Sequence, residues 1–290
     1  MNFKKAILIA GGSGSRLNPI TNQISKQLLP IYDKPMIYYP LSILMLLKIR
    51  DIQIITTIES NTYYKSLLGN GKRFGIQITY NIQKSPQGIA HAIKISKDFI
   101  DKKNVCVILG DNIFYGQSLI ENIKNGIVQN NGATIFGYYM KNPNEYGVVR
   151  VNKKNEIIEI IEKPKKIISN YAIPGLYFFD KNLLRHIAKL KYSKRKELEI
   201  TDLLKEYLKE KKLNYKVFGR GLAWLDTGNA DALLSASNFI KTIEDRQGIK
   251  VACLEEIALN NKWINKKNLK ESIKKNKKSV YFNYLNQLIK

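Results

Sequence analysis

A glycine-rich loop follows the first apolar run of the chain and constrains the fold more than any other feature. The run Ala6–Ile9 has the continuous hydrophobicity of a buried parallel strand. Residues 10–16 read Ala-Gly-Gly-Ser-Gly-Ser-Arg, so three glycines leave the backbone amides bare. Such amides can approach a bulky anion closely, and Arg16 adds a forked cation. The pattern predicts a phosphate-binding loop after the first strand.

The loop matches neither of the two common phosphate-binding signatures. It lacks the Gly-Lys-Ser/Thr ending of a P-loop, and Leu17 stands where a dinucleotide fingerprint has its third glycine. A plain turn between a strand and a helix is therefore an alternative interpretation. A second cation, Lys26, follows in another loop that is closed by Pro30. Two cations near one glycine loop favour a triphosphate ligand.

Composition bounds the class of protein. A chain of 290 residues with 44% apolar and 25% charged residues is long enough for a sizeable core and ordinary for a globular protein. No apolar run reaches the length of a membrane span, so we expect no membrane partner. The two cysteines, Cys106 and Cys253, give neither a disulfide framework nor metal-ligand spacing, which favours a cytoplasmic protein.

The net charge of +24 raises the question of a nucleic-acid partner. Forty of the 48 basic residues are lysines, and Ile and Asn are also abundant, as drift toward A and T codons would produce. The lysines are scattered, with the densest group at 266–278, and no basic stripe alternates with aromatic residues. We therefore expect no nucleic-acid binding, although a positive field would assist small anionic substrates.

Strands and helices alternate through the first half of the chain, which predicts a parallel, doubly wound α/β sheet. Apolar or β-branched runs predict strands at 52–58, 76–82, 105–109 and 133–140. Helical spacing of apolar residues predicts helices at 36–48, 62–68, 88–100 and 118–130.

The second half departs from this alternation. A hairpin is predicted at 147–151 and 157–162, strands at 175–179 and 215–218, helices at 182–190 and 199–209, and a loop at 221–226. From residue 230 onward the pattern is helical, at 230–245, 255–261, 267–276 and 279–288. We predict one α/β domain over 1–230, with a Rossmann-like mixed sheet, and a helical extension over 231–290 that serves oligomer contacts.

Two aspartates are candidate metal ligands. Asp111 directly follows the apolar strand 105–109, and Asp226 lies in the segment Trp-Leu-Asp-Thr-Gly. Ligands of open α/β sheets bind outside the carboxyl ends of the strands, where a carboxylate can hold Mg²⁺ while phosphates fill its other positions. A helix-capping or turn aspartate is the alternative for Asp111. Whether two residues so distant in sequence converge stays open at this point.

Weaker candidates lie in three other places. Lys163, at a strand end in Glu-Lys-Pro, is either a point charge for a sugar phosphate or one more solvated lysine. The turn 83–88 either reads the edge of a base or simply opens a helix. His91 and His186 lie in predicted helices without a nucleophilic partner, and we interpret both as packing or surface residues.

Five blocks of sequence carry a more specific signal. They are Gly11–Leu17, Ser25–Met36, Leu109–Phe114, Glu162–Pro164 and Ala223–Gly228. Together they resemble the glucose-1-phosphate thymidylyltransferases of the sugar nucleotidyltransferase family. The resemblance implies the nucleotide-diphospho-sugar transferase fold and a Mg²⁺-dependent reaction of dTTP with glucose 1-phosphate that yields dTDP-glucose and pyrophosphate. In that family the reaction opens the synthesis of dTDP-rhamnose and related dTDP-sugars.

The resemblance also implies a role for each matching residue. The nucleotide would be held by Gly11, Gly12, Ser13, Arg16, Lys26, Gln27, Gln83, Pro86, Gly88 and Asp111. The sugar phosphate would be held by Asn112, Tyr146, Gly147, Glu162, Lys163, Ile173 and Trp224. Asp111 and Asp226 would hold the metal, and these two count as catalytic together with Arg16, Lys26 and Lys163.

Members of the family are usually homotetramers in which a nucleotide sugar, here expected to be dTDP-rhamnose, binds as an effector at a subunit interface. The matching positions are Tyr115, Gly116, Arg220, Lys250, Val251, Ala252, Cys253, Glu256 and Ile257. Asn260 stands where the effector site usually has an arginine. Two alternatives stay open, a uridylyl- or cytidylyltransferase of a similar sugar phosphate and a non-catalytic protein that binds a nucleotide or nucleic acid.

Overall fold

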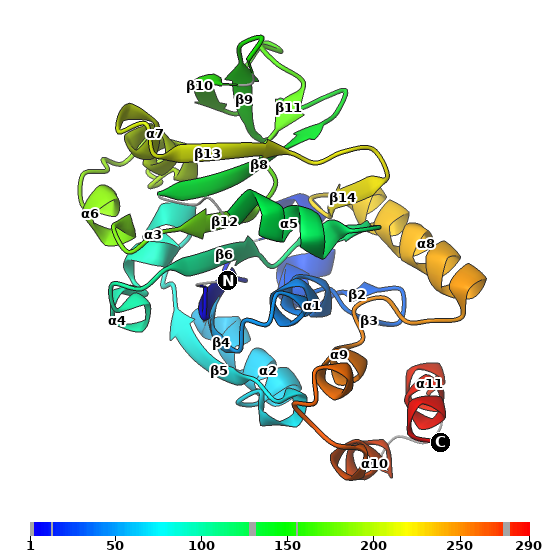
Figure 1. Ribbon diagram of the computed structural model, residues 1–290. Helices are drawn as coiled ribbons and strands as arrows, with labels where there is room; N and C mark the ends of the chain where they lie inside the picture. The colour runs from blue at the N-terminus through cyan, green and yellow to red at the C-terminus, as the bar shows by residue number, and fades with distance from the viewer. Residues whose placement is uncertain (1–2, 13, 128–131, 155, 275–278) are drawn as a thin grey trace.

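A mixed β-sheet forms the centre of the molecule. The computed structural model describes residues 3–12, 14–127, 132–154, 156–274 and 279–290 (Figure 1). In this part of the chain the main sheet has the strand order β10-β9-β11-β8-β12-β6-β1-β4-β5, with β13 paired to β8. The parallel strands at one end of the sheet are β1 (Lys5–Ile9), β4 (Asp51–Thr56), β5 (Gln77–Ile82) and β6 (Val105–Leu109).

The other end of the sheet is largely antiparallel. Its strands are β8 (Ala133–Tyr139), β9 (Gly147–Val151), β10 (Ile157–Glu162), β11 (Tyr171–Ala172), β12 (Leu176–Phe179) and β13 (Leu213–Val217). Strand β12 runs antiparallel to both β6 and β8, while β13 is parallel to β8. The predicted hairpin is confirmed as β9 and β10, which stand at the edge of the molecule with β11 (Figure 1).

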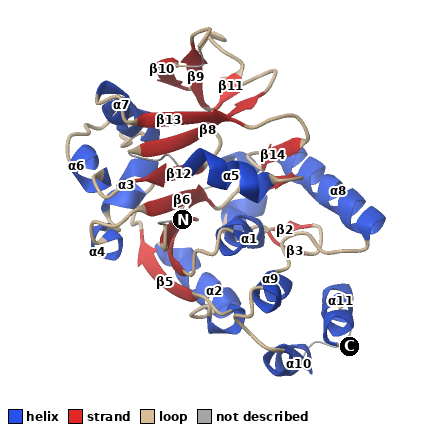
Figure 2. Ribbon diagram, in the orientation of Figure 1, coloured by secondary structure: helices blue, strands red, loops and turns tan. Residues whose placement is uncertain are grey.

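Helices cover both faces of the sheet, as a doubly wound fold requires (Figure 2). On one face lie α1 (Tyr38–Leu46), α2 (Ile58–Leu68) and α5 (Leu119–Ile127). On the other lie α3 (Ile89–Lys94), α4 (Lys97–Ile100), α6 (Leu183–Ile187) and α7 (Ile200–Lys209). Successive side chains of β1 alternate between them, because Leu8 joins the first core and Ile7 the second. The expected fold class is thus confirmed.

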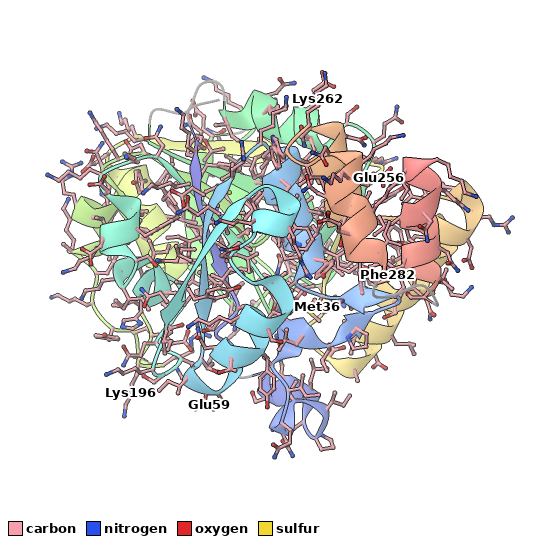
Figure 3. All side chains as sticks on the ribbon, turned by 90° about the horizontal axis from the view of Figure 1, so that it is seen from below. Met36, Glu59, Lys196, Glu256, Lys262 and Phe282 are labelled. Atoms are coloured by element: carbon pink, nitrogen blue, oxygen red, sulfur yellow. The ribbon has the colours of Figure 1, made fainter. Side chains whose placement is uncertain are left out.

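The C-terminal helices are α8 (Ala230–Gln247), α9 (Leu254–Asn260), α10 (Lys266–Lys274) and α11 (Val280–Ile289). Helix α9 inserts Leu254 and Ala258 into the same core as α1, so it is part of the main body. Figure 3 shows Glu256 of α9 and Phe282 of α11 on adjacent helices. No helix in the described ranges combines the length and hydropathy that crossing a bilayer needs.

One predicted loop is wrong. Residues 221–226 contain a strand, β14 (Leu222–Asp226), which pairs antiparallel with the unpredicted strand β7 (Asn112–Gly116). The two strands are more than a hundred residues apart in sequence, and each forms its backbone hydrogen bonds with the other. Neither segment therefore has a strong strand pattern in its own sequence. This two-stranded ribbon carries much of the candidate site described below.

Smaller differences have local causes. The predicted helix 88–100 is split into α3 and α4 at Ser96, whose hydroxyl donates to the Ala92 carbonyl oxygen. The predicted strand 52–58 ends at Thr56 because the Thr57 side chain caps α2, accepting a hydrogen bond from the Ser60 amide. The ends of two predicted helices, 128–130 and 275–276, lie outside the described residues.

Candidate active site

The glycine loop after β1 folds back against a second loop. Gly14 has φ +63°, and a Cβ there would lie 3.1 Å from Thr21 Cγ2 and 3.2 Å from Lys26 Cβ. The Thr21 hydroxyl donates to the Gly14 carbonyl oxygen at 2.9 Å. Only glycine combines this left-handed backbone with so close an approach. The two cations of the sequence analysis, Arg16 and Lys26, therefore come from loops that touch each other.

Asp111 and Asp226 converge, which the sequence left open. Asp111 follows β6, and the register of the ribbon pairs Asn112 with Asp226. Lys26 Nζ donates to Asp111 Oδ2 at 2.7 Å and lies 4.0 Å from Asp226 Oδ1. Lys26 is only 6% exposed. One buried ammonium group thus faces two carboxylates at the carboxyl end of the sheet, where open α/β proteins bind ligands.

The two carboxylates carry more negative charge than Lys26 alone balances. Burial, and secondly the Asp111 carboxylate, raise the pKa of Asp226 to about 6, while Lys26 acts in the opposite direction. A desolvated carboxylate of this kind favours the approach of a further cation. Perturbed groups that line a cavity are candidates for function.

We expect Asp226→Asn to stabilise the folded protein by about 3 kcal/mol at pH 8. The folded state binds the Asp226 proton more tightly than the unfolded state, so ionisation above pH 6 costs folding free energy that the amide avoids. The gain should fade as the pH falls through 6 toward 4, because the folded protein then takes up the Asp226 proton and no longer holds this buried negative charge. Denaturant unfolding at several pH values, without added metal, measures this difference. Asp98→Asn, at an exposed aspartate, is the control. An Asp226→Asn protein that is less stable than the wild type at pH 8 contradicts the expectation.

Arg16 lies beside Asp226 at the mouth of the site. A Cβ on Gly228 would come within 2.8 Å of Arg16 Nη2 and 3.0 Å of Asp226 Oδ2, so both side chains pass over this glycine. Arg16 also forms an ion pair with Glu145, which the sequence analysis missed, and its side chain is more than half exposed. Arg16 is therefore a partly solvated cation whose guanidinium can exchange Glu145 for an incoming anion.

A cavity of about 190 Å³ opens next to Asp111 and Asp226. Its lining includes Arg16 and all the residues expected to hold the sugar phosphate, namely Asn112, Tyr146, Gly147, Glu162, Lys163, Ile173 and Trp224. These residues come from β7, the β9–β10 hairpin, the segment after β11, and β14. The two carboxylates and the residues expected to hold the sugar phosphate thus line one cavity.

Asn112 links the carboxylate pair to the aromatic wall of the cavity. Its amide nitrogen donates to Asp111 Oδ1 at 2.9 Å, and its amide oxygen accepts from the Gly175 amide at 2.9 Å and from Trp224 Nε1 at 2.7 Å. The Trp224 ring meets the Tyr146 ring edge to face at 4.9 Å. Asn112 is 3% exposed, and its hydrogen bonds fix Asp111 and Trp224 relative to each other.

Arg195 is the main residue of the cavity that the sequence analysis missed. Its guanidinium donates to Glu199 at 2.7 and 3.1 Å and to Glu162 Oε1 at 3.3 Å. Burial, followed by the Glu199 carboxylate, raises the pKa of Glu162, and Arg195 acts against this rise. Arg195 lies between Lys194 and Lys196 in a protein that has forty lysines, so the sequence around it gives no sign of a function. Arg195 lines the cavity together with the cations of Arg16 and Lys163.

The residues expected around the base form a separate group behind the glycine loop. Gln83 Nε2 donates to the Gly88 carbonyl oxygen at 3.2 Å, and a Cβ on Gly11 would lie 3.3 Å from Gln83 Oε1. Gly88 has φ +94° and lies against Leu198. These residues do not line the cavity described above.

The other residues expected to bind the nucleotide differ in their exposure to solvent. Gln27 is buried, and its side-chain oxygen accepts from Ser25 and Tyr64. It therefore supports the Lys26 loop from within. Gly12 and Pro86 are exposed on the surface. Ser13 lies outside the described residues.

The residues expected to bind an effector are divided by the structure. Tyr115, Gly116, Lys250, Val251 and Ala252 line a second cavity, of about 620 Å³, which α1, α5 and β7 also border. The others do not line it: Cys253 and Ile257 are buried, Glu256 accepts a hydrogen bond from the Tyr284 hydroxyl, and Arg220 is exposed.

Comparisons with known proteins identify the family of this chain. Residues 5–243 match the model of the family described as nucleotidyl transferase. The glucose-1-phosphate thymidylyltransferase of Neisseria meningitidis is 49% identical over 99% of both chains, and that of Xanthomonas campestris is 49% identical over 100% of this chain and 98% of its own. A Bacillus anthracis structure assigned to the same class, solved with sucrose, superposes with a TM-score of 0.75 at 39% identity, covering 81% of this chain and 94% of that one. The chain therefore belongs to the nucleotidyl transferase family, within its glucose-1-phosphate thymidylyltransferases.

Proposed function

We propose that this chain converts dTTP and α-D-glucose 1-phosphate into dTDP-glucose and pyrophosphate. A phosphate oxygen of the sugar phosphate forms a bond to the α-phosphorus of dTTP as the bond from that phosphorus to the bridging oxygen breaks, and pyrophosphate leaves with that oxygen. One observation carries the proposal most: Asp111 and Asp226, which meet at the buried Lys26 ammonium group, line one cavity together with Arg16, Lys163 and Arg195.

The carboxylate pair fits a divalent metal, and Mg²⁺ is the ion we propose. Mg²⁺ is usually held by one or two carboxylates while substrate phosphates and water complete its octahedron. Asp111 and Asp226 supply two such ligands, and in the described residues no group of three or more potential metal-binding side chains forms a complete protein cage. When bound, the ion would neutralise phosphate charge and so lower the repulsion between the two substrates.

The protein's own cations act on the same repulsion. The nucleophile is already anionic, so the reaction needs no general base, and positioning and charge stabilisation supply most of the catalysis. Lys26 and Arg16 lie at the glycine loop, where they would stabilise the negative charge that builds up on the departing pyrophosphate. Lys163 and Arg195 line the same cavity and would hold the attacking phosphate in line.

The remaining wall suits a sugar. Glu162 accepts hydrogen bonds from Arg195 and can accept them from hydroxyl groups as well. Trp224 and Tyr146 provide an aromatic surface, and Gly147 has no room for a side chain, because a Cβ would lie 2.9 Å from Thr201. Gln83, Gly11 and Gly88 would contact the base. A uridylyl- or cytidylyltransferase would use the same machinery with different contacts there.

The other expectations stay proposals. Free thiols at Cys106 and Cys253 suit a reducing cytoplasm, where the product would enter dTDP-rhamnose synthesis. We propose that residues 1–230 form the catalytic domain and that 231–290 serve a homotetramer. The cavity beside Tyr115 and Lys250 would then take a dTDP-rhamnose effector.

Pyrophosphate release, with each substrate omitted in turn, tests the reaction. We expect release only when a nucleoside triphosphate, glucose 1-phosphate and Mg²⁺ are all present. Release of inorganic phosphate, or release without the sugar phosphate, would refute the proposed transfer and favour hydrolysis.

Lys163→Met should raise the KM for glucose 1-phosphate about tenfold while leaving the KM for dTTP unchanged. Lys163 lines the cavity and is exposed to solvent, so its charge-assisted contact to the phosphate is partly screened and worth less than a buried one. Initial rates with each substrate varied separately give both constants. Lys165→Met, an exposed lysine two positions along, is the matched control. An equal rise in both KM values would place Lys163 elsewhere in the mechanism.

A further inference from the structure

Four charged side chains form a buried cluster outside the active site. Lys34 Nζ lies 2.5 Å from Asp33 Oδ1 and 2.8 Å from Glu244 Oε1, and Lys250 Nζ lies 2.6 Å from Asp33 Oδ2 and 2.5 Å from Glu244 Oε2. The Lys34 and Glu244 side chains are 2% and 3% exposed. We call Asp33, Lys34, Glu244 and Lys250 the four-charge cluster.

The cluster joins the C-terminal end of α8 to a small hairpin beside the active site. This hairpin, β2 (Pro30–Ile31) and β3 (Lys34–Pro35), directly follows the 3-10 turn Lys26–Leu28 that carries Lys26. In Figure 1 it lies between α1 and α8. Asp33 and Lys34 belong to the hairpin, whereas Glu244 lies in the last turn of α8 and Lys250 follows it. The cluster therefore spans two segments about 210 residues apart in sequence.

Backbone hydrogen bonds connect the hairpin rigidly to the Lys26 turn. The Ile37 amide donates to the Gln27 carbonyl oxygen at 2.9 Å, and the Met36 amide donates to the Leu29 carbonyl oxygen at 2.9 Å. Met36 Sδ also accepts from the Thr227 hydroxyl, next to Asp226, at 3.2 Å. A shift of the hairpin would thus move the turn that holds Lys26 against Asp111.

Stability alone is a poor reason for this cluster. Buried ion pairs cost desolvation energy that their attraction barely offsets, and apolar side chains of the same volume often do as well. The hairpin already packs on α8 through Ile31, Met36, Ala236 and Ile240. The two positive and two negative groups add orientation, because each lysine lies within ion-pair distance of both carboxylates in the observed arrangement. A slipped hairpin would leave a buried charge without a partner.

We propose that the four-charge cluster positions Lys26, with Lys34 and Glu244 as positioning residues for the transfer reaction. This inference rests on the proposed function, because Lys26 acts there on the nucleotide phosphates. The cluster fixes the position of the hairpin, and the hairpin fixes the position of the 26–28 turn. This turn holds Lys26 Nζ next to the two carboxylates. None of the four side chains lines the active-site cavity.

The test is a double-mutant cycle between Glu244→Gln and Lys26→Met. Glu244→Gln keeps the shape of the side chain and removes its charge. We expect it to lower kcat/KM for dTTP about tenfold, since misplacing a catalytic group by a fraction of an ångström is costly, and to leave the KM for glucose 1-phosphate unchanged. In a Lys26→Met background the same substitution should change the residual rate less than about twofold, because the group it positions is gone.

Controls separate positioning from general destabilisation. Asp180→Asn removes another buried carboxylate, bonded to the Tyr207 hydroxyl at 3.0 Å, and should lower the Tm without changing kcat/KM. Lys34→Arg keeps the charge and should retain more activity than Lys34→Met. If Glu244→Gln does not fold, Asp33→Asn replaces it, because Asp33 contacts the same two lysines and its side chain is 15% exposed.

Either of two kinetic results would overturn the proposal. One is an unchanged kcat/KM in folded Glu244→Gln, and the other is an equal fold-loss on Glu244→Gln substitution in the wild-type and the Lys26→Met proteins. A crystal structure of Glu244→Gln shows the position of Lys26 directly, without an activity measurement. Lys26 Nζ should leave hydrogen-bond distance of Asp111 Oδ2, and an unmoved Lys26 refutes the inference. Failure of the proposed function has a different signature, because the wild-type protein would then release no pyrophosphate.

Discussion

Asp111→Asn should lower kcat about a thousandfold, the largest loss we expect from a single isosteric change. Asp111 is one of only two carboxylates in the described residues that meet at Lys26, so its replacement removes half of the anionic charge available to a metal. The amide is also a weak ligand for a hard cation. Asn112 can still donate to the new side-chain oxygen, so the fold should survive.

Steady-state pyrophosphate release, with thermal unfolding of the same sample, measures this effect. Asp180→Asn serves as the control because it changes a buried aspartate of the same size that takes no part in the Lys26 contacts. Retention of more than about a tenth of the wild-type kcat by Asp111→Asn would show that this carboxylate is not part of the machinery.

Lys26→Met should lower kcat/KM for dTTP about a hundredfold or more. The substitution removes the ammonium group that faces Asp111 and Asp226 and leaves their repulsion uncompensated at the end of the cavity where the triphosphate would lie. The methionine keeps most of the buried side-chain volume, so packing around the 26–28 turn should change little. The loss should fall mainly on the nucleotide, with a smaller effect on the KM for glucose 1-phosphate.

Separate substrate titrations of Lys26→Met check this expectation. Lys84→Met, at an exposed lysine of the turn before α3, is a matched change in charge. If Lys26→Met and Lys84→Met behave alike, the positive field of the whole protein, rather than the placement of one buried ammonium, governs nucleotide use.

The strands of the parallel half could be predicted because the residues of each strand alone indicate that it is buried. Val105–Leu109 is apolar throughout, and the structure covers both of its faces. The ribbon β7–β14 could not be predicted in the same way. Glycines lie on both sides of β14, at Gly221 and Gly228, and β7 and β14 are extended because they pair with each other. Pairing over such a separation leaves no local signal.

The same distinction applies to the site. Arg16 ends a glycine-rich loop, Asp111 follows a strand, and Lys26 lies in a loop closed by Pro30, so the sequence around each residue made it a candidate for ligand binding. The convergence of Asp111 with Asp226 depends on the β7–β14 ribbon, and the local sequence around either aspartate does not predict it. Arg195 and Glu145 carry no motif at all, because their roles arise from loops folded over the cavity.

The four-charge cluster shows a third case. Asp33 and Lys34 fall inside a block that the family resemblance marks, yet nothing in that block names Glu244 and Lys250 as their partners. The partners are found only where α8 ends beside the hairpin. Charged residues in a lysine-rich chain are interpreted as solvated by default, and burial is the property that sequence alone does not give.

The most direct test follows the phosphorus atoms of the nucleotide through one reaction. The protein is mixed with glucose 1-phosphate, Mg²⁺ and dTTP labelled at the α- or the γ-phosphate, beside identical reactions with UTP and CTP and with the Asp111→Asn variant. The account predicts that the α-label enters a nucleotide sugar and the γ-label leaves in pyrophosphate, fastest with dTTP and nearly absent in the variant. Recovery of the γ-label in inorganic phosphate or on the sugar, or full activity in Asp111→Asn, would contradict it.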